Sequence, residues 1–123
     1  MLTSNRIVAF AATRDPKRAK AFYSDTLGLK LVSEDPFALV FDVHGTMLRV
    51  TSVGEFTPHP FTVLGWETPD IASDIKNLVE AGVKFERFPG MKQNDLGVWT
   101  APSGGKIAWF KDPDGNTLSL TEF

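Results

Sequence analysis

The sequence contains no cysteine and has no excess of positive charge. Without cysteine, the chain forms no disulfide framework, no thiolate metal site and no cysteine nucleophile. Thirteen Lys and Arg residues stand against fifteen Asp and Glu residues, and the formal net charge is −2. Because phosphate binding needs a basic surface, we expect no nucleic-acid partner.

Long hydrophobic runs are also missing. No apolar stretch approaches the roughly 18 residues that a membrane helix requires. The opening MLTSNRIVAF lacks the charged segment and long apolar run of a signal peptide. We therefore expect a cytoplasmic protein without a membrane partner. With 123 residues, 42% of them hydrophobic, the chain can build one domain with a sizeable core.

The chain does contain an internal repeat. Val8 matches Val63 and Asp15 matches Asp70, both at a spacing of 55 residues. The segment GTMLRVTSV in the middle of the chain returns as GNTLSLTEF at its end. Because these matches follow one another in order, they indicate a duplicated structural unit.

Each copy predicts the same order of elements. Alternating apolar residues indicate strands, and Asp15 followed by Pro16 is typical of a helix start that runs to Gly28. Helices are expected over residues 15–28 and 70–82, and strands over 6–13, 29–34, 37–43, 46–53, 61–67, 83–88, 97–101, 106–111 and 116–123. The pattern predicts an α+β fold of two tandem βαβββ modules whose sheets curve around a shared cleft.

The expected organisation is a single domain, residues 1–123. Its first module covers about residues 5–54, a linker about 55–60 and the second module about 61–123.

Two segments give this order a family resemblance: DPKRAKAFYSDTLGLKL after the first strand and WFKDPDGNTLSL before the last. The sequence resembles the vicinal oxygen chelate superfamily, which includes glyoxalase I, extradiol dioxygenases and the fosfomycin- and bleomycin-resistance proteins. The resemblance covers essentially the whole chain and implies the fold above and a homodimer. Since one segment starts a helix and the other forms a hairpin turn, neither favours an activity.

The resemblance also implies where a divalent metal would bind. In metal-dependent members, His, Gln or Glu from the first and last strands of each module hold the ion. These positions fall on Val8, Arg49, Val63 and Ser119. Two are aliphatic, one is a cation and one is a weak hydroxyl ligand. We therefore predict no metal site and no cofactor.

Strand alternation assigns further side chains to the cleft. The predicted ligand-binding residues are Val8, Phe10, Arg49, Val63, Glu67, Ile107, Trp109 and Ser119. An apolar, partly aromatic wall with one guanidinium suits a flat or aromatic ligand that carries an anionic group. Trp109 equally fits a core position, and the alternative for Arg49 is an ion pair with Glu67 or Glu122.

These residues favour a metal-independent small-molecule-binding protein. One alternative is a glyoxalase-like lyase or isomerase, or a dioxygenase-type enzyme, whose metal site would need a different strand register. Another is a metal-independent lyase in which Arg49 stabilises an oxyanion and Glu67 or Glu122 acts as base. The face of Trp99 stays open, and residues 87–97 are expected either as a mobile loop over the cleft or as an exposed connector.

Overall fold

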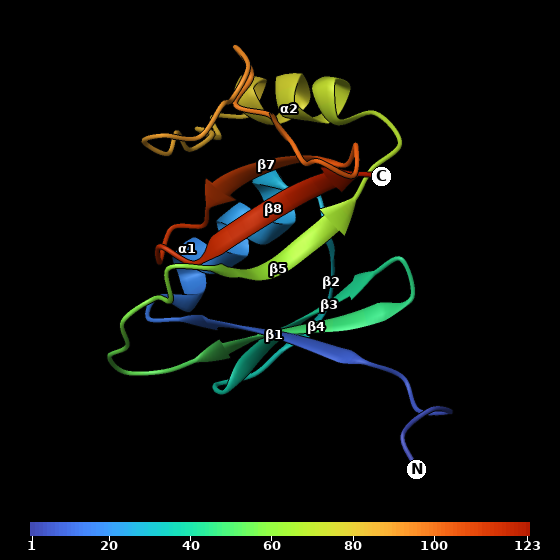
Figure 1. The fold of residues 1–123 in the computed structure, drawn as a ribbon. Coiled ribbons are helices and arrows are strands. Elements are labelled where there is room, and N and C mark those ends of the chain that lie inside the picture. The colour runs from blue at the N-terminus through green and yellow to red at the C-terminus, as the bar shows by residue number, and fades with distance from the viewer. The chain divides into compact units, whose positions relative to one another are not determined.

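The computed structural model describes residues 1–123, which divide into two compact units, Met1–Thr57 and Pro58–Phe123. Each unit contains one four-stranded mixed sheet and one helical segment (Figure 1). The predicted α+β class with two tandem βαβββ modules is therefore confirmed. No helix of the chain combines the length and the apolar character needed to cross a membrane.

The first unit keeps the predicted elements. It consists of β1 (Val8–Thr13), α1 (Pro16–Lys20), the π-helical segment η1 (Ala21–Thr26), β2 (Lys30–Glu34), β3 (Ala38–Val43) and β4 (Thr46–Ser52). The strands lie in the order β1-β4-β3-β2, with β1 parallel to β4 and the other pairs antiparallel. Helix α1 contacts β3 and β4, so one face of this sheet is covered.

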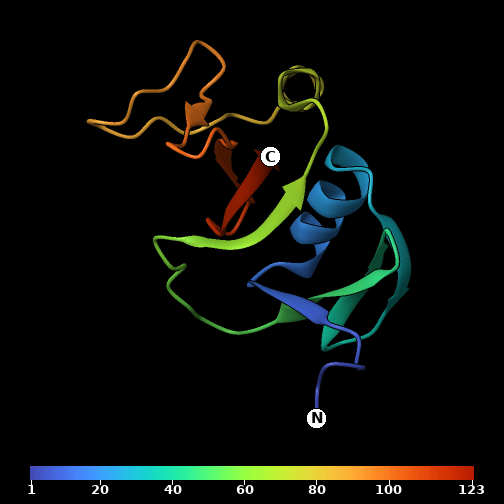
Figure 2. The ribbon, with the colours of Figure 1, turned by 45° about the vertical axis from the view of Figure 1, so that its right-hand side comes forward.

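The first helical segment begins as an α-helix and widens into a π-helix. The Asp15 carboxylate accepts a hydrogen bond from the Arg18 amide (3.2 Å), which satisfies one of the free amides of the first turn. Farther along, the Leu27 amide donates to the Phe22 carbonyl, five residues earlier (2.9 Å). Figure 2 shows α1 and η1 as one continuous coil. The fully buried Tyr23 on η1 packs against the core of this unit.

The second unit repeats the same sheet order. It consists of β5 (Thr62–Glu67), α2 (Ile71–Glu80), β6 (Trp99–Thr100), β7 (Lys106–Lys111) and β8 (Thr117–Glu122). The strands lie in the order β5-β8-β7-β6, with β5 parallel to β8. Asp70 caps α2 by accepting a hydrogen bond from the Ser73 amide (3.1 Å). The fully buried Phe110 lies between the rings of Trp66 and Phe85.

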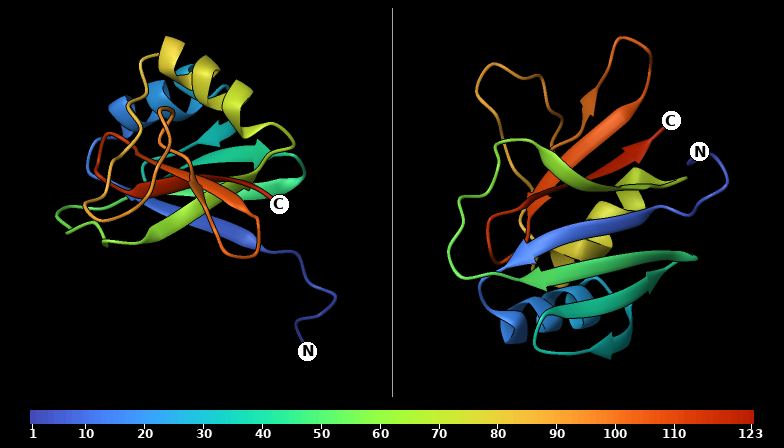
Figure 3. Two further views of the ribbon diagram at one scale, coloured as in Figure 1. Left: turned by 45° about the horizontal axis from the view of Figure 1, so that its top comes forward. Right: turned by 90° about the horizontal axis from the view of Figure 1, so that it is seen from below.

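The strand predicted over residues 83–88 is wrong. Only a bridge between Phe85 and Phe110 and a hydrogen bond from the Glu86 amide to the Trp109 carbonyl (2.8 Å) remain of it. The chain then leaves the sheet as the loop 87–98 and returns as the two-residue strand β6, shorter than the predicted 97–101. In Figure 3 this loop stands out from the sheet beside β7. The outer edge of β7 is therefore shared by two short segments instead of one strand.

The DPDGN segment forms the predicted turn between β7 and β8. The Asp112 carboxylate accepts hydrogen bonds from the Asp114 and Asn116 amides, both at 2.9 Å, and from the Asn116 side-chain amide at 2.8 Å. Gly115 supplies the positive φ of 90° that the turn requires. The Asp112 carboxylate is thus used to build the turn.

Candidate functional site

The first sheet presents one face that its helix does not cover. Val8 and Phe10 are 41% and 58% exposed, whereas Leu48 and Val50 are buried on the opposite face. Strand register places Arg49 between Phe10 on β1 and Val40 on β3. We call this the open face of the first sheet, and the alternation predicted for β1 and β4 describes it correctly.

Arg49 is half-buried on this open face and forms no hydrogen bond or ion pair within the first unit. Its charge acts on Asp35, in the turn before β3. The Asp35 carboxylate accepts hydrogen bonds from the amides of Phe37 (2.7 Å) and Ala38 (3.0 Å). These two bonds, and then the Arg49 charge, hold the pKa of Asp35 below its usual value of 3.8. The guanidinium donors of Arg49 thus keep their capacity for an anion.

Glu122 and Glu67, the two carboxylates considered as bases, differ in their surroundings. Glu122 accepts a hydrogen bond from the Ile71 amide at the start of α2 (3.0 Å) and lies 3.5 Å from the Lys106 ammonium. It therefore links β8 to β7 and α2. Glu67 is exposed at the end of β5, in register with Thr121.

The second sheet carries a corresponding row of three residues, Gly65, Ser119 and Trp109, on neighbouring strands. Ser119 is only 6% exposed. A Cβ added at Gly65 would lie 2.7 Å from the Ser119 hydroxyl oxygen, too close for any real side chain. The Ser119 hydroxyl thus occupies space that is free only because residue 65 is a glycine. We call the face with this row the open face of the second sheet.

Val63, which is predicted to lie on this face, coincides with an irregularity of β5. A β-bulge interrupts the pairing of β5 with β8, so that Thr62, not Val63, lies in register with Thr117. The Trp109 indole nitrogen donates a hydrogen bond to the Thr62 hydroxyl (3.1 Å), which places Thr62 beside Trp109. The half-buried Val63 occupies the bulge, and its contribution to this face stays a prediction.

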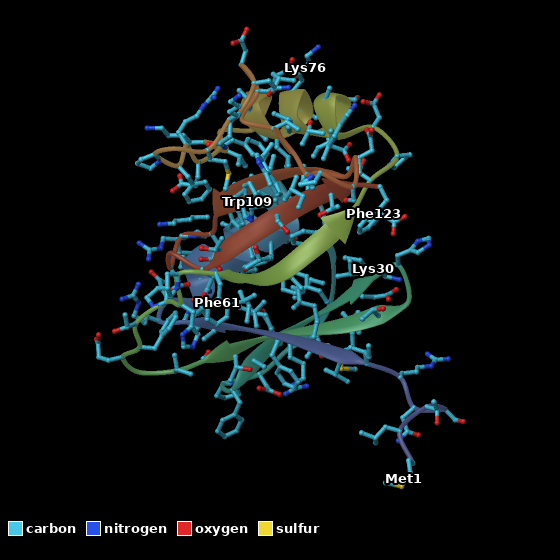
Figure 4. The ribbon with its side chains drawn as sticks, viewed as in Figure 1. Met1, Lys30, Phe61, Lys76, Trp109 and Phe123 are labelled. Atoms are coloured by element: carbon cyan, nitrogen blue, oxygen red, sulfur yellow. The ribbon has the colours of Figure 1, made fainter.

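Three aromatic rings gather on the second unit: Phe88, Trp99 and Trp109. The Phe88 ring meets Trp109 edge-on with centroids 5.5 Å apart, and Trp99 lies at 6.3 Å from Trp109. Trp99 also pairs with Ile107, which shares the face of Trp109. The face of Trp99, open in the sequence, is thereby assigned to this aromatic cluster. Figure 4 marks Trp109 on β7.

Trp66 lies on the opposite face of the same sheet. Its ring stacks on the buried Phe110 at 6.4 Å, as expected for a core residue. Phe88 and Thr62 were not among the predicted site residues. Phe88 could have been recognised as a site residue because it is an aromatic residue directly before the Pro89-Gly90 turn. Thr62 could not, because the bulge that places it beside Trp109 has no local signal in the sequence.

The loop 87–98 and β6 line an open surface groove of about 900 Å³ next to the aromatic cluster. Its lining residues are Phe88, Pro89, Gly90, Met91, Lys92, Gln93, Asn94, Val98, Trp99 and Thr100. Both rings that flank Trp109 thus also line the groove.

Residues with metal-binding side chains are dispersed. Neither unit brings three or more His, Cys, Asp or Glu side chains into a group that could hold a metal ion. His44 and Gly45, both with positive φ, form the turn between β3 and β4. His59 stacks on Phe61, with ring centroids 4.9 Å apart.

The comparisons with known proteins agree with this fold. The chain is similar to a superfamily member from Sphaerobacter thermophilus (26% identity, all of both chains covered, TM-score 0.74). It also resembles a lactoylglutathione lyase from Agrobacterium tumefaciens (21% identity, 97% of this chain and 93% of that one, TM-score 0.74). A glyoxalase family protein from Enterococcus faecalis is 22% identical over 99% of this chain and all of that one, with a TM-score of 0.72.

No curated protein sequence is similar enough to count as a match. The model of one family, however, matches residues 5–120, nearly the whole chain. The chain therefore belongs to the Glyoxalase/Bleomycin resistance protein/Dioxygenase superfamily.

Proposed function

We propose that this protein binds a flat aromatic small molecule carrying an anionic group and that it does so without a metal ion. The observation that carries the proposal is the aromatic cluster on the second unit. Trp109 and Trp99 are half-buried and Phe88 is 37% exposed, so ring surface stays available for a ligand. Aromatic rings bind one another in edge-on and offset arrangements, which suits a planar ligand.

Arg49 supports the anionic part of the proposal. It lies among apolar neighbours on the open face of the first sheet, and its guanidinium makes no hydrogen bond or ion pair in its own unit. A guanidinium holds a carboxylate or phosphate through two parallel hydrogen bonds.

The side chains at the expected metal positions do not fit a divalent ion. Val8 offers no ligand atom, and the charge of Arg49 opposes a cation. Ser119 packs its hydroxyl against Gly65, and the bulge brings in Thr62, whose hydroxyl already accepts the Trp109 bond. We therefore derive no chemical step through a metal.

As part of the same proposal, we expect the protein to form a homodimer, and analytical ultracentrifugation measures this.

Calorimetric titration with Ni²⁺, Mn²⁺, Fe²⁺ and Zn²⁺ tests metal independence. We expect no stoichiometric binding at micromolar metal. One tightly bound metal per chain would contradict the proposal and favour the glyoxalase- or dioxygenase-type alternative.

A thermal-shift screen of aromatic acids, followed by Arg49→Ala, tests the anion site. We expect Arg49→Ala to weaken the best ligand at least about fivefold, since a hydrogen bond to a charged group contributes about 1.5–3 kcal/mol before solvent screening. Lys30→Ala on β2 is the matched control and should leave affinity unchanged. Unchanged affinity in Arg49→Ala would refute the role of Arg49.

A further inference from the structure

The loop that lines the groove beside the aromatic cluster is braced by hydrogen bonds of its own side chains. The Gln93 side-chain amide donates to the carbonyls of Glu86 and Gly97, both at 2.9 Å, and accepts from the Phe88 amide at 2.8 Å. The Asn94 side-chain oxygen accepts from the amides of Leu96 (3.0 Å) and Val98 (2.9 Å). A loop braced in this way needs little ordering when a ligand binds.

The guanidinium of Arg87 completes this bracing. It donates to the Asp95 carbonyl at 2.8 Å and lies 3.4 Å from the Gln93 carbonyl. Arg87 is therefore committed to the loop itself.

Lys92 is the one charged residue that lines the groove. The two lysines of β7 are engaged elsewhere, because Lys106 pairs with Glu122 (3.5 Å) and Lys111 with Glu86 (3.7 Å). Lys92 is exposed and forms no ion pair within its unit. Lys92 is thus the cation that lines the same groove as Phe88 and Trp99.

We propose that this groove is a binding subsite for an aromatic acid. The ring of the ligand packs against Trp99 and Phe88, the flexible Met91 adapts to its edge, and Lys92 attracts the acid group. The subsite lies within the second unit and does not include Arg49. The inference rests on the proposed function in its choice of ligand class, and it adds the residues that recognise the acid.

Nuclear magnetic resonance of the full chain with 2-naphthoate tests the ring contact. The chain has three tryptophans, whose indole N–H signals can be assigned with Trp66→Phe, Trp99→Phe and Trp109→Phe. We expect saturable shifts of the Trp99 signal and smaller ones at Trp109. Trp66, on the opposite face of the sheet, is the internal control. The subsite would be overturned if the Trp99 signal did not shift with naphthoate. It would also be overturned if the signal shifted only with protein concentration, because a second copy of the chain would then cover the groove.

The acid contact is tested by removing one charge from the protein and one from the ligand. Lys92→Gln should weaken 2-naphthoate binding about two- to fivefold, the range of an exposed ion pair, and should leave naphthalene-2-carboxamide binding unchanged. Lys76→Gln on the outer surface of α2 is the matched control (Figure 4). Equal affinities of Lys92→Gln and wild type for naphthoate would overturn the role of Lys92.

The same titration with Arg49→Ala separates this inference from the proposed function. If Arg49→Ala loses naphthoate binding while Lys92→Gln binds naphthoate like the wild type, the subsite is overturned and the proposed function stands. The reverse result would support the groove and count against Arg49 as the anion site.

Discussion

The two units share one sheet plan and differ in the row of residues that crosses each open face. In the first unit, Arg49 lies between Phe10 and Val40, and in the second, Ser119 lies between Gly65 and Trp109. One row presents a charge among apolar neighbours. The other presents an aromatic ring beside two small residues. Duplication of the backbone has therefore been followed by different chemistry at equivalent positions.

The outer strand differs as well. In the first unit, β2 pairs with β3 through a single bulge. In the second unit, the corresponding edge of β7 is divided between the Phe85 bridge and β6, with the loop 87–98 between them. The interruption creates the groove and brings Phe88 and Trp99 to Trp109. A change at the edge of a sheet thus added surface without altering the central strand order.

The largest expected effect tests what the units share. Phe41 and Phe110 occupy equivalent places, opposite Leu48 and Leu118, and both are fully buried. We expect Phe41→Ala and Phe110→Ala each to lower the free energy of unfolding by about 3–5 kcal/mol. Urea denaturation followed by circular dichroism measures this. A loss below about 1 kcal/mol at either position would show that the two cores are not equivalent.

A smaller effect is expected at Gly65, where the rows differ. Gly65→Ala should cost about 1–3 kcal/mol because the new methyl group meets the Ser119 hydroxyl. The second change Ser119→Ala should restore part of the loss. Gly54→Ala is the control, since nothing lies within 4 Å of a Cβ there. Equal thermal unfolding curves for Gly65→Ala and Gly54→Ala would contradict the close contact.

The smallest effect concerns pH and one turn. In the turn before β3, the Asp35 carboxylate accepts hydrogen bonds from two backbone amides. The turn before β7 is closed by a backbone hydrogen bond instead, from the Ala101 amide to the Gly105 carbonyl (2.7 Å). Because folding lowers the pKa of Asp35, its contribution to stability is complete above its usual pKa of 3.8 and is lost as pH falls through the lowered value. Asp35→Asn should therefore flatten the acid side of the stability profile.

Thermal unfolding of wild type and Asp35→Asn over acidic pH measures this effect, with Asp25→Asn on η1 as the control. Parallel profiles for wild type and Asp35→Asn would argue against the contribution of Asp35.

Much of the fold could be predicted from local residue patterns. Alternation identified β1, β4, β7 and β8 and the faces of Arg49 and Trp109, and an Asp cap identified each helix start. The prediction of a strand over residues 83–88 was wrong although these residues have strand propensity. The edge of β7 with which they would pair is shared with β6, so that only the Phe85 bridge forms. Propensity does not encode which of two segments obtains an edge.

The sequence by itself therefore determined the repeat, the family and the alternation of side chains, because these depend on residues close together in the chain. Only the tertiary structure decided the bulge at Val63, which brings Thr62 beside Trp109, the face of Trp99 and the groove of residues 88–100. Each of these depends on a partner strand distant in sequence, and a shift of one residue in its register moves side chains to the other face.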